Sequence, residues 1–192
     1  MTRQAPQQDR LARRDEPSGR SASARVVIRP ADRPGDLGWM VQAHGEIYSA
    51  EYGWDTSFEA LVARIVAEYA ADHDPVREAA WLAEVDGERA GCVLCVAADN
   101  TTAKLRILLT TPSARGRGAG TALVRTCVEF ARQAGYLRMV LWTNDVLVGA
   151  RRIYLASGFR LVAEEPHHSF GADLVGQTYE VELATGPSVP AR

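Results

Sequence analysis

The sequence contains no long apolar run, and this absence excludes membrane proteins first. No stretch approaches the roughly 20 apolar residues that cross a bilayer, and the N-terminus has no short apolar segment typical of a secretory signal. Excess positive charge is also lacking, because 22 Lys and Arg residues stand against 24 Asp and Glu residues, giving a formal net charge of -2. A slightly acidic chain has no overall field that attracts nucleic acid. We therefore expect a cytoplasmic protein that binds neither membranes nor nucleic acid.

Cysteine is scarce as well, with three residues in a chain of 192. Cys92 and Cys95 have the spacing of half a zinc site, but the run 91–96 that contains them is typical of a strand. An offset of three on a strand places side chains on opposite faces, and no second cysteine pair follows. We predict that there is no metal site and that the thiols are buried and reduced, as in a reducing compartment.

The length and the hydrophobic fraction of 46% predict one globular domain. Residues 1–24 are rich in Arg, Gln, Ser, Ala and Pro and have few large apolar side chains, so we expect a disordered tail there. A basic arm that touches nucleic acid is the alternative for this tail, because its arginines outnumber its acids. The folded domain is expected over 25–184, and 185–192 are expected to fray.

Hydrophobic periodicity predicts the elements of this domain. Expected strands cover 25–29, 79–85, 89–97, 103–109, 138–143, 159–164 and 177–183, and expected helices cover 37–50, 56–71, 120–134 and 148–157. Asp86-Gly87 is a hairpin signal, 51–55 are expected to link the first two helices, and Thr56 with Glu59 predicts a capping box. We expect 166–168 to lie in a loop. This order is typical of an α/β or α+β domain with a mixed sheet.

The segment 110–120 predicts a binding site for an anion. A strand enters a turn that holds three glycines with Arg115 and Arg117, and a helix begins near Gly120. Glycines allow backbone N–H groups to converge on one point, a helix N-terminus adds unpaired donors, and arginine matches phosphate oxygens. A dinucleotide loop would need glycine at Thr121, and a Walker A loop would need a lysine that this segment lacks.

Arg115, Gly118 and Ala119-Gly120 form the pattern R-x-x-G-x-G/A, which resembles the acyl-CoA pyrophosphate loop of the GNAT superfamily of N-acetyltransferases. The run 151–159, which contains Tyr154, Gly158 and Phe159, resembles a second signature of that superfamily. The resemblance covers 25–184 and implies the GNAT fold, a mixed and mostly antiparallel sheet of about seven strands flanked by about four helices.

A narrower resemblance concerns three further segments. Residues 141–147, 164–171 and 173–178 are similar to the acetyltransferase module found behind MarR-type winged-helix regulators. Because 1–24 are too short for a winged helix, we expect this module to stand alone.

The resemblance implies roles for individual residues. The donor is acetyl-CoA, and Leu108, Leu109 and Thr110 are expected to bind its pantetheine arm through their backbone. The expected pyrophosphate-binding residues are Arg115, Gly116, Arg117, Gly118, Ala119, Gly120 and Thr121. The cofactor-binding asparagine of many members is replaced here by Leu147, so we assign that contact to Asn144. Tyr154 is the expected acid that protonates the CoA thiolate after direct attack by the amine in a ternary complex.

The acceptor is expected to be a primary amine, either a small molecule or a peptide. Glu51, Tyr52, Trp54, His167 and His168 are the expected acceptor-binding residues, and the acidity of Glu51 and Asp55 favours a cationic amine. The general base stays open among Glu46, Glu51, Glu84, His167 and His168. A non-catalytic acyl-CoA-binding regulatory module is the alternative function. Two copies of the chain are expected to be able to pair, as in many relatives.

Overall fold

The structure is a computed structural model, and it describes residues 25–183. The expected tails, 1–24 with its alternative role as a basic arm and 185–192, lie outside the described residues, as does residue 184. The strands are β1 (Val26–Pro30), β2 (Ala79–Val85), β3 (Glu88–Ala97), β4 (Thr102–Thr110), β5 (Arg138–Asn144), β6 (Arg160–Ser169) and β7 (Ala172–Glu182). The helices are α1 (Asp36–Tyr52), α2 (Thr56–Asp72), α3 (Ala119–Gln133) and α4 (Val148–Ala156), with a short 3-10 turn at Pro112–Ala114.

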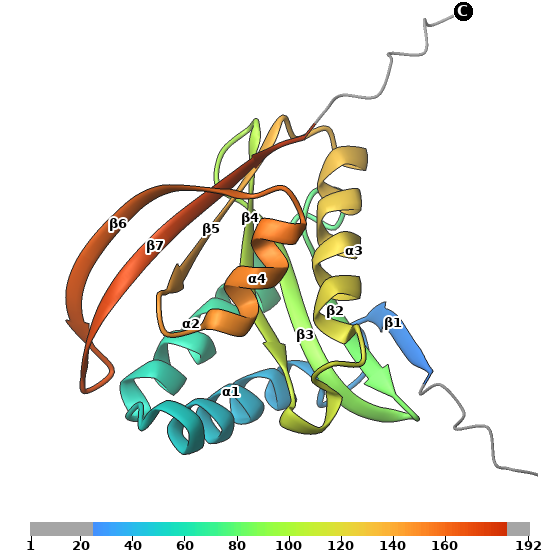
Figure 1. Cartoon of the computed structure of the whole chain (residues 1–192). Coiled ribbons are helices and arrows are strands. Elements are labelled where there is room, and N and C mark those ends of the chain that lie inside the picture. The colour runs from blue at the N-terminus through green and yellow to red at the C-terminus, as the bar shows by residue number, and fades with distance from the viewer. Residues whose placement is uncertain (1–24, 184–192) are drawn as a thin grey trace, which may run out of the picture.

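The seven strands form one sheet in the order β1-β2-β3-β4-β5-β7-β6. Only β4 and β5 run parallel, and every other neighbouring pair is antiparallel. The sheet is flanked by α1 and α2 on one face and by α3 and α4 on the other (Figure 1). The expected mixed, mostly antiparallel sheet with four helices is confirmed.

Each face of the sheet has its own hydrophobic core. Leu123, Val124 and Cys127 of α3 pack on one face, and Met40 of α1 and Val62 of α2 pack on the other. Cys95 belongs to the first core and Cys92 to the second, so the expected placement of these thiols on opposite faces is confirmed. Both thiols are buried and free.

The link between α1 and α2 differs from the sequence expectation. Because α1 continues to Tyr52 and ends at Gly53, whose φ of 69° suits a glycine C-cap, Glu51 and Tyr52 are helical residues. The cap of α2 is Asp55, whose carboxylate accepts the backbone N–H of Ser57 at 2.9 Å. The predicted capping box of Thr56 with Glu59 is therefore wrong by one residue.

The expected loop at 166–168 is also wrong, because these residues lie within β6. The chain turns instead at Phe170 and Gly171, which have φ of 60° and 77°, and β6 pairs with β7 from Arg160 to Ser169. A proline is tolerated in an edge strand because its missing N–H can face away from the partner. Most of β6 is exposed, so it has no alternating apolar pattern that would mark a strand.

Candidate functional site

The site begins with an irregularity in β4. Cys92 pairs with Leu109 and Leu94 pairs with Arg106, so two residues of β4 stand opposite Val93 alone. One of the two, Ile107, has a φ of 48°, which is rare for a β-branched residue. This is a β-bulge, and it changes which side chains face which side of the sheet.

Before the bulge, Ala103 and Leu105 pack in the core under α3. Strand alternation therefore directs Lys104 and Arg106 to the face covered by α1 and α2. After the bulge the parity is reversed, because Leu108 packs on the α3 face and Leu109 on the α1 and α2 face.

The bulge also separates β4 from β5. The parallel pairing extends only from Thr102↔Arg138 to Leu105↔Leu141, although β4 continues to Thr110 and β5 to Asn144. Within the described residues, β4 therefore has no strand partner from Ile107 to Thr110 on the side that faces away from β3. The N–H and C=O groups of this edge are available to a ligand.

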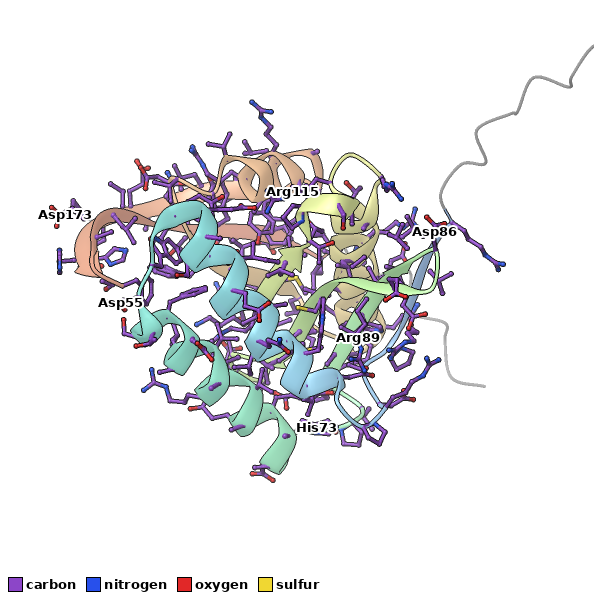
Figure 2. The ribbon with its side chains drawn as sticks, turned by 90° about the horizontal axis from the view of Figure 1, so that it is seen from below. Asp55, His73, Asp86, Arg89, Arg115 and Asp173 are labelled. Atoms are coloured by element: carbon purple, nitrogen blue, oxygen red, sulfur yellow. The ribbon has the colours of Figure 1, made fainter. Side chains whose placement is uncertain are left out.

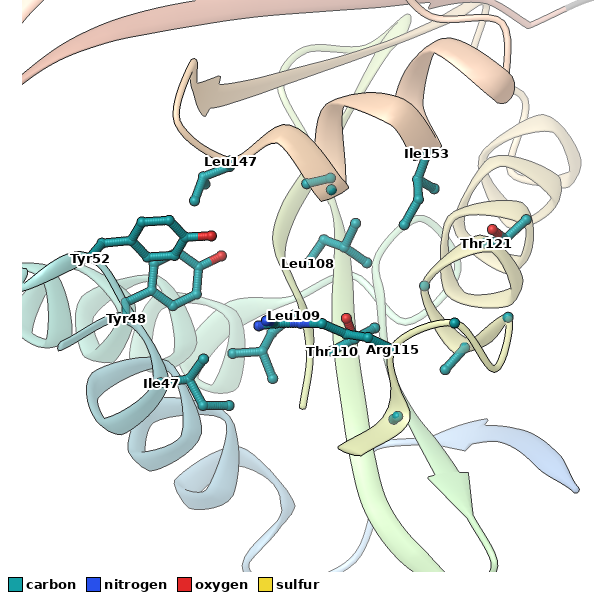
Figure 3. A pocket seen from close by; sticks show the side chains of 17 residues that line it. Ile47, Tyr48, Tyr52, Leu108, Leu109, Thr110, Arg115, Thr121, Leu147 and Ile153 are labelled. Carbon is teal, nitrogen blue, oxygen red and sulfur yellow. The ribbon is translucent and has the colours of Figure 1, made fainter. Parts of the chain in front are cut away.

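A cavity of about 500 Å³ opens along this free edge. Figure 3 shows its walls, with Leu108–Thr110 of β4 in the middle, Tyr48 and Tyr52 of α1 on one side, and Thr121 of α3 and Ile153 of α4 on the other. The glycine-rich loop closes one end of this cavity, to which Arg115, Gly116, Gly118, Ala119, Gly120 and Thr121 all contribute.

Two glycines explain the local geometry of this loop. Gly118 is the N-cap of α3 with a φ of 84°, a left-handed conformation that favours glycine, and no side chain caps the helix. The first N–H groups of α3 are thus free to bind an anion. A Cβ on Gly120 would lie 2.7 Å from Cδ1 of Ile153, so a larger residue here would require the end of the Ile153 side chain to move.

The two loop arginines have different environments. Arg115 lines the cavity, and its Nη1 and Nη2 each lie 2.8 Å from a carboxylate oxygen of Glu51, a pairing that raises the pKa of the guanidinium. Arg117 is not part of the cavity wall. It pairs instead with Asp86 at 3.2 Å, at the tip of the β2–β3 hairpin (Figure 2). Of the expected loop residues, Arg117 is therefore placed away from the cavity.

A second cavity of about 250 Å³ lies between α1, α2, β4 and β5. Its wall is formed by His44, Tyr48, Trp54, Phe58, Leu61, Val62, Ile65, Lys104, Leu105, Arg106, Ile107, Leu108, Trp142, Thr143, Asn144, Leu147, Ala150 and Tyr154. Four of these residues, Tyr48, Leu108, Leu147 and Ala150, also line the first cavity. The two cavities therefore adjoin where β4 leaves β5.

Tyr154 of α4 lies in the wall of the second cavity and is 4% exposed. Its ring lies 5.9 Å from that of Phe159 and 6.3 Å from that of Tyr179. Burial raises the pKa of the phenol above its ordinary value, so the hydroxyl keeps its proton at neutral pH and can act as a proton donor.

Asn144 lies in the second cavity and not in the first. Its Oδ1 is 2.9 Å from Nε2 of His167, whose ring packs 5.4 Å from Trp142. Leu147, which stands where many GNAT members have asparagine, lines both cavities. The cofactor contact expected of Asn144 would thus have to be made from the second cavity.

The remaining expected residues lie at different distances from the cavities. Trp54 lines the second cavity and Tyr52 the first. His168 is exposed and pairs with Asp173 near the tip of the β6–β7 hairpin. Asp55 is occupied in capping α2. None of the five expected general bases lines the second cavity. All five have other partners: Glu46 accepts from Gln42, Glu51 pairs with Arg115, Glu84 with Arg29 and His168 with Asp173, and His167 lies within hydrogen-bond distance of Asn144.

Four polar residues of the second cavity were not predicted from the sequence: His44, Lys104, Arg106 and Thr143. The two cations occupy alternate positions in an otherwise apolar strand, a pattern that could have identified them. His44 was expected only as part of an amphipathic helix face. It is 1% exposed, its Nδ1 is 2.7 Å from the carbonyl oxygen of Met40, and burial lowers its pKa to about 4.

Comparison with known proteins agrees with this geometry. The model of the family described as "Acetyltransferase (GNAT) family" matches residues 40–159. N-acetylaspartate synthetase of Rattus norvegicus is 37% identical over 90 residues, which are 46% of this chain and 30% of that protein. N-acetyltransferase 8B of Homo sapiens is 32% identical over 93 residues, which are 46% of this chain and 41% of that protein. The matched stretch thus spans well under half the length of these relatives.

Two solved structures show the shared fold. The Salmonella typhimurium protein yncA, solved with its cofactor acetyl-CoA, superposes with a TM-score of 0.69 at 18% identity, covering 87% of this chain and 99% of that chain. The ribosomal-protein-alanine N-acetyltransferase of Brucella melitensis gives a TM-score of 0.66 at 16% identity, covering 82% and 99%. Within residues 25–183 no helix is long and apolar enough to cross a membrane, and no group of side chains is arranged to hold a metal ion.

Proposed function

The chain belongs to the acetyltransferase (GNAT) family, and we propose that it transfers the acetyl group of acetyl-CoA to a primary amine. One observation carries this proposal: two cavities meet at Leu108, where the edge of β4 is free on the side that faces away from β3. One cavity has an anion-binding loop at its end, and the other has a buried phenol in its wall. This arrangement suits a donor and an acceptor that react at the junction.

The hydrogen-bonding groups of the first cavity suit acetyl-CoA. The uncapped N–H groups of α3 and the guanidinium of Arg115 suit a pyrophosphate. The free backbone edge of Leu108–Thr110 suits the amides of a pantetheine arm, and one of its N–H groups would stabilise the oxyanion that forms on the acetyl carbonyl. Bound acetyl-CoA supplies an acetyl group activated as a thioester.

The chemical step follows from the residues at the junction. The amine nitrogen bonds to the acetyl carbon, the carbon–sulfur bond breaks, and Tyr154 gives its hydroxyl proton to the departing sulfur. Because none of the expected bases lines the second cavity, we propose that the amine loses its proton to water. The tyrosine then regains a proton from solvent.

An assay of CoA thiol release with a panel of primary amines tests this function. We expect amine-dependent thiol release together with an acetylated amine identified by mass spectrometry. Saturable binding of acetyl-CoA with no release for any amine would favour the alternative, a non-catalytic acyl-CoA-binding regulatory module.

Three finer expectations remain proposals. The kinship with MarR-fused modules is supported only by the sequences of β5, the loop after it and the β6–β7 hairpin. A cytoplasmic location is supported by three buried free thiols. A homodimer is supported by the exposed edge strand β6, and light scattering during size-exclusion chromatography tests it.

A further inference from the structure

The charge of the second cavity is unexpected for a site that receives an amine. Among the residues that the structure describes, its wall contains Lys104 and Arg106 but no aspartate or glutamate. The two acids expected to attract a cationic amine have other partners, since Glu51 pairs with Arg115 and Asp55 caps α2. A cationic acceptor would therefore meet two like charges and no opposite charge within this cavity.

Neither cation is neutralised by the described residues. Within 25–183, Lys104 and Arg106 form no ion pair within 4.0 Å. Burial lowers the pKa of Lys104, and the positive charge of Arg106 lowers it further. Burial also lowers the pKa of Arg106. The charge of Glu68 raises the pKa of Arg106, and the charge of Arg64 lowers it. Partly desolvated cations without a partner bind a carboxylate more strongly than exposed ones do.

The position of both cations follows from the alternation of β4 before its bulge, which places them on the side of the second cavity. Arg106 lies two residues and Lys104 four residues before Leu108, where the cavities adjoin. The bulge at Ile107 interrupts the extended strand between Arg106 and Leu108, and Lys104 lies a further two extended residues, roughly 7 Å, along β4. An acceptor with its amine at the junction would thus meet Arg106 first, and would reach Lys104 with an acidic group farther from that amine.

Apart from His44, Thr143 and Asn144, the rest of the wall is formed by aliphatic and aromatic side chains. Tyr48, Trp54 and Phe58 form a cluster, with Tyr48 and Phe58 ring centroids 4.6 Å apart, and Trp142 is 45% exposed at the rim. Such a wall binds an apolar side chain, preferably an aromatic one.

We propose that the acceptor is an amine that also bears a carboxylate and an apolar side chain, as in an aromatic amino acid or a short peptide that contains one, and that Lys104 and Arg106 bind its carboxylate. The inference rests on the acetyl transfer proposed above. The same two cations have a second effect, because a positive, partly dry site favours the neutral form of the amine. Only the neutral amine can attack the thioester, so this effect reduces the need for a general base.

Matched acceptors test this inference. We would measure kcat/KM in the thiol-release assay for phenylalanine, phenylalaninamide and phenethylamine, and for the dipeptide glycylphenylalanine and its amide. The acids should exceed their counterparts without a carboxylate by about tenfold or more, the effect of one charge-assisted hydrogen bond. The single amino acid and the dipeptide distinguish the two lengths of acceptor.

Substitutions at Lys104 and Arg106 test whether the preference for a carboxylate arises in the second cavity. Lys104→Met and Arg106→Met should raise KM for the preferred acid about tenfold and leave the amide unchanged, while Lys104→Arg should retain the preference. Lys104 is the only lysine of the chain, so Lys104→Met removes the one lysine ammonium group of the protein. Arg125→Met is the control, because Arg125 is exposed on α3 and lines neither cavity.

The outcomes separate this inference from the proposed function. Acetylation of phenethylamine as fast as phenylalanine, or a preference that survives Lys104→Met together with Arg106→Met, would overturn the carboxylate site while acetyl transfer stands. If no amine is acetylated at all, the proposed function fails and the inference fails with it.

Discussion

Asp36 is completely buried at the first turn of α1, where two arginines hold its carboxylate. Arg29 approaches Oδ2 at 2.6 Å, and Arg89 approaches Oδ1 at 2.9 Å. The backbone N–H of Arg33 also donates to Oδ2. This network ties the start of α1 to β1 and β3, and thereby fixes the helix whose other end supplies Tyr48 and Tyr52 to the first cavity.

Substitution of this carboxylate should be costly. Asp36→Asn removes the charge that faces Arg29, which is 8% exposed and keeps only Glu84 as an acidic partner. We expect the free energy of unfolding to fall by about 1.5–3 kcal/mol, the effect of losing a hydrogen bond between charged groups, measured by urea denaturation. Asp32→Asn, at an exposed position on the same loop, should change it by less than about 0.5 kcal/mol. Equal effects at both positions would contradict the account of the network.

The same carboxylate predicts a pH dependence. Hydrogen bonds from Arg29, followed by the backbone N–H of Arg33, lower the pKa of Asp36 from 3.8 to about 2 in the folded state. The unfolded chain therefore binds a proton first as pH falls, so the stabilisation is fully present above about pH 4 and is lost between about pH 4 and pH 2. Denaturation curves at several pH values should show this loss for the wild type. Asp36→Asn should show a weaker pH dependence in that window.

Tyr154 carries a prediction for catalysis. Phenylalanine keeps the buried ring but removes the proton donor, so Tyr154→Phe should lower kcat by about 10²-fold or more with nearly unchanged acetyl-CoA affinity. Turnover comes from thiol release and affinity from calorimetry. A variant that loses affinity in proportion to turnover, or that keeps its turnover, would exclude the proposed role as an acid.

At the scale of elements, the two ends of α3 offer a matched comparison. Gly118 before the helix and Gly135 after it both have a φ of 84°, and at both positions a Cβ would meet no neighbouring atom within 4 Å. Gly118→Val and Gly135→Val should each lower the free energy of unfolding by about 1–2 kcal/mol. Only Gly118→Val should weaken acetyl-CoA binding, by about tenfold or more, because only this substitution reorients the N–H groups of the loop. Calorimetric titration of both variants makes the comparison, and equal losses of affinity would contradict the assigned anion site.

The elements also show what sequence patterns can and cannot predict. Alternation and helical periodicity predicted seven strands and four helices, since most of them bury one apolar face. The same reasoning missed the full length of β6, whose exposed edge carries no such pattern. It also missed the bulge, because nothing in the apolar run around Ile107 indicates a positive φ.

The same distinction between local and long-range features applies to the expected site residues. The glycine-rich loop was identifiable because its chemistry is local, and its glycines with Arg115 do line the first cavity. Arg117 and Glu51 form ion pairs with segments distant in sequence, which no local pattern reveals. Lys104 and Arg106 face the second cavity through strand alternation before the bulge, and only the packing of α1, α2 and β5 around β4 encloses them there.

At the scale of the whole molecule, the fold separates β4 from β5 at one end of the sheet and surrounds the space between these strands with helices. The sheet holds β4 and β5 together over Thr102–Leu105 and lets them part beyond it. Helices from opposite faces then reach the gap: α1 brings Tyr48 from one side, and α4 brings Ala150 from the other. The proposed donor and acceptor would therefore occupy adjoining cavities that share Leu108.

Calorimetric titration of the wild-type protein with acetyl-CoA, and separately with free CoA, tests this account most directly. The account predicts saturable binding of both ligands in the micromolar range with one site per chain. It also predicts that prior saturation with CoA abolishes the binding of acetyl-CoA, because both occupy the cavity beside β4. No binding of either ligand would contradict the assignment of this cavity and, with it, the proposed acetyl transfer.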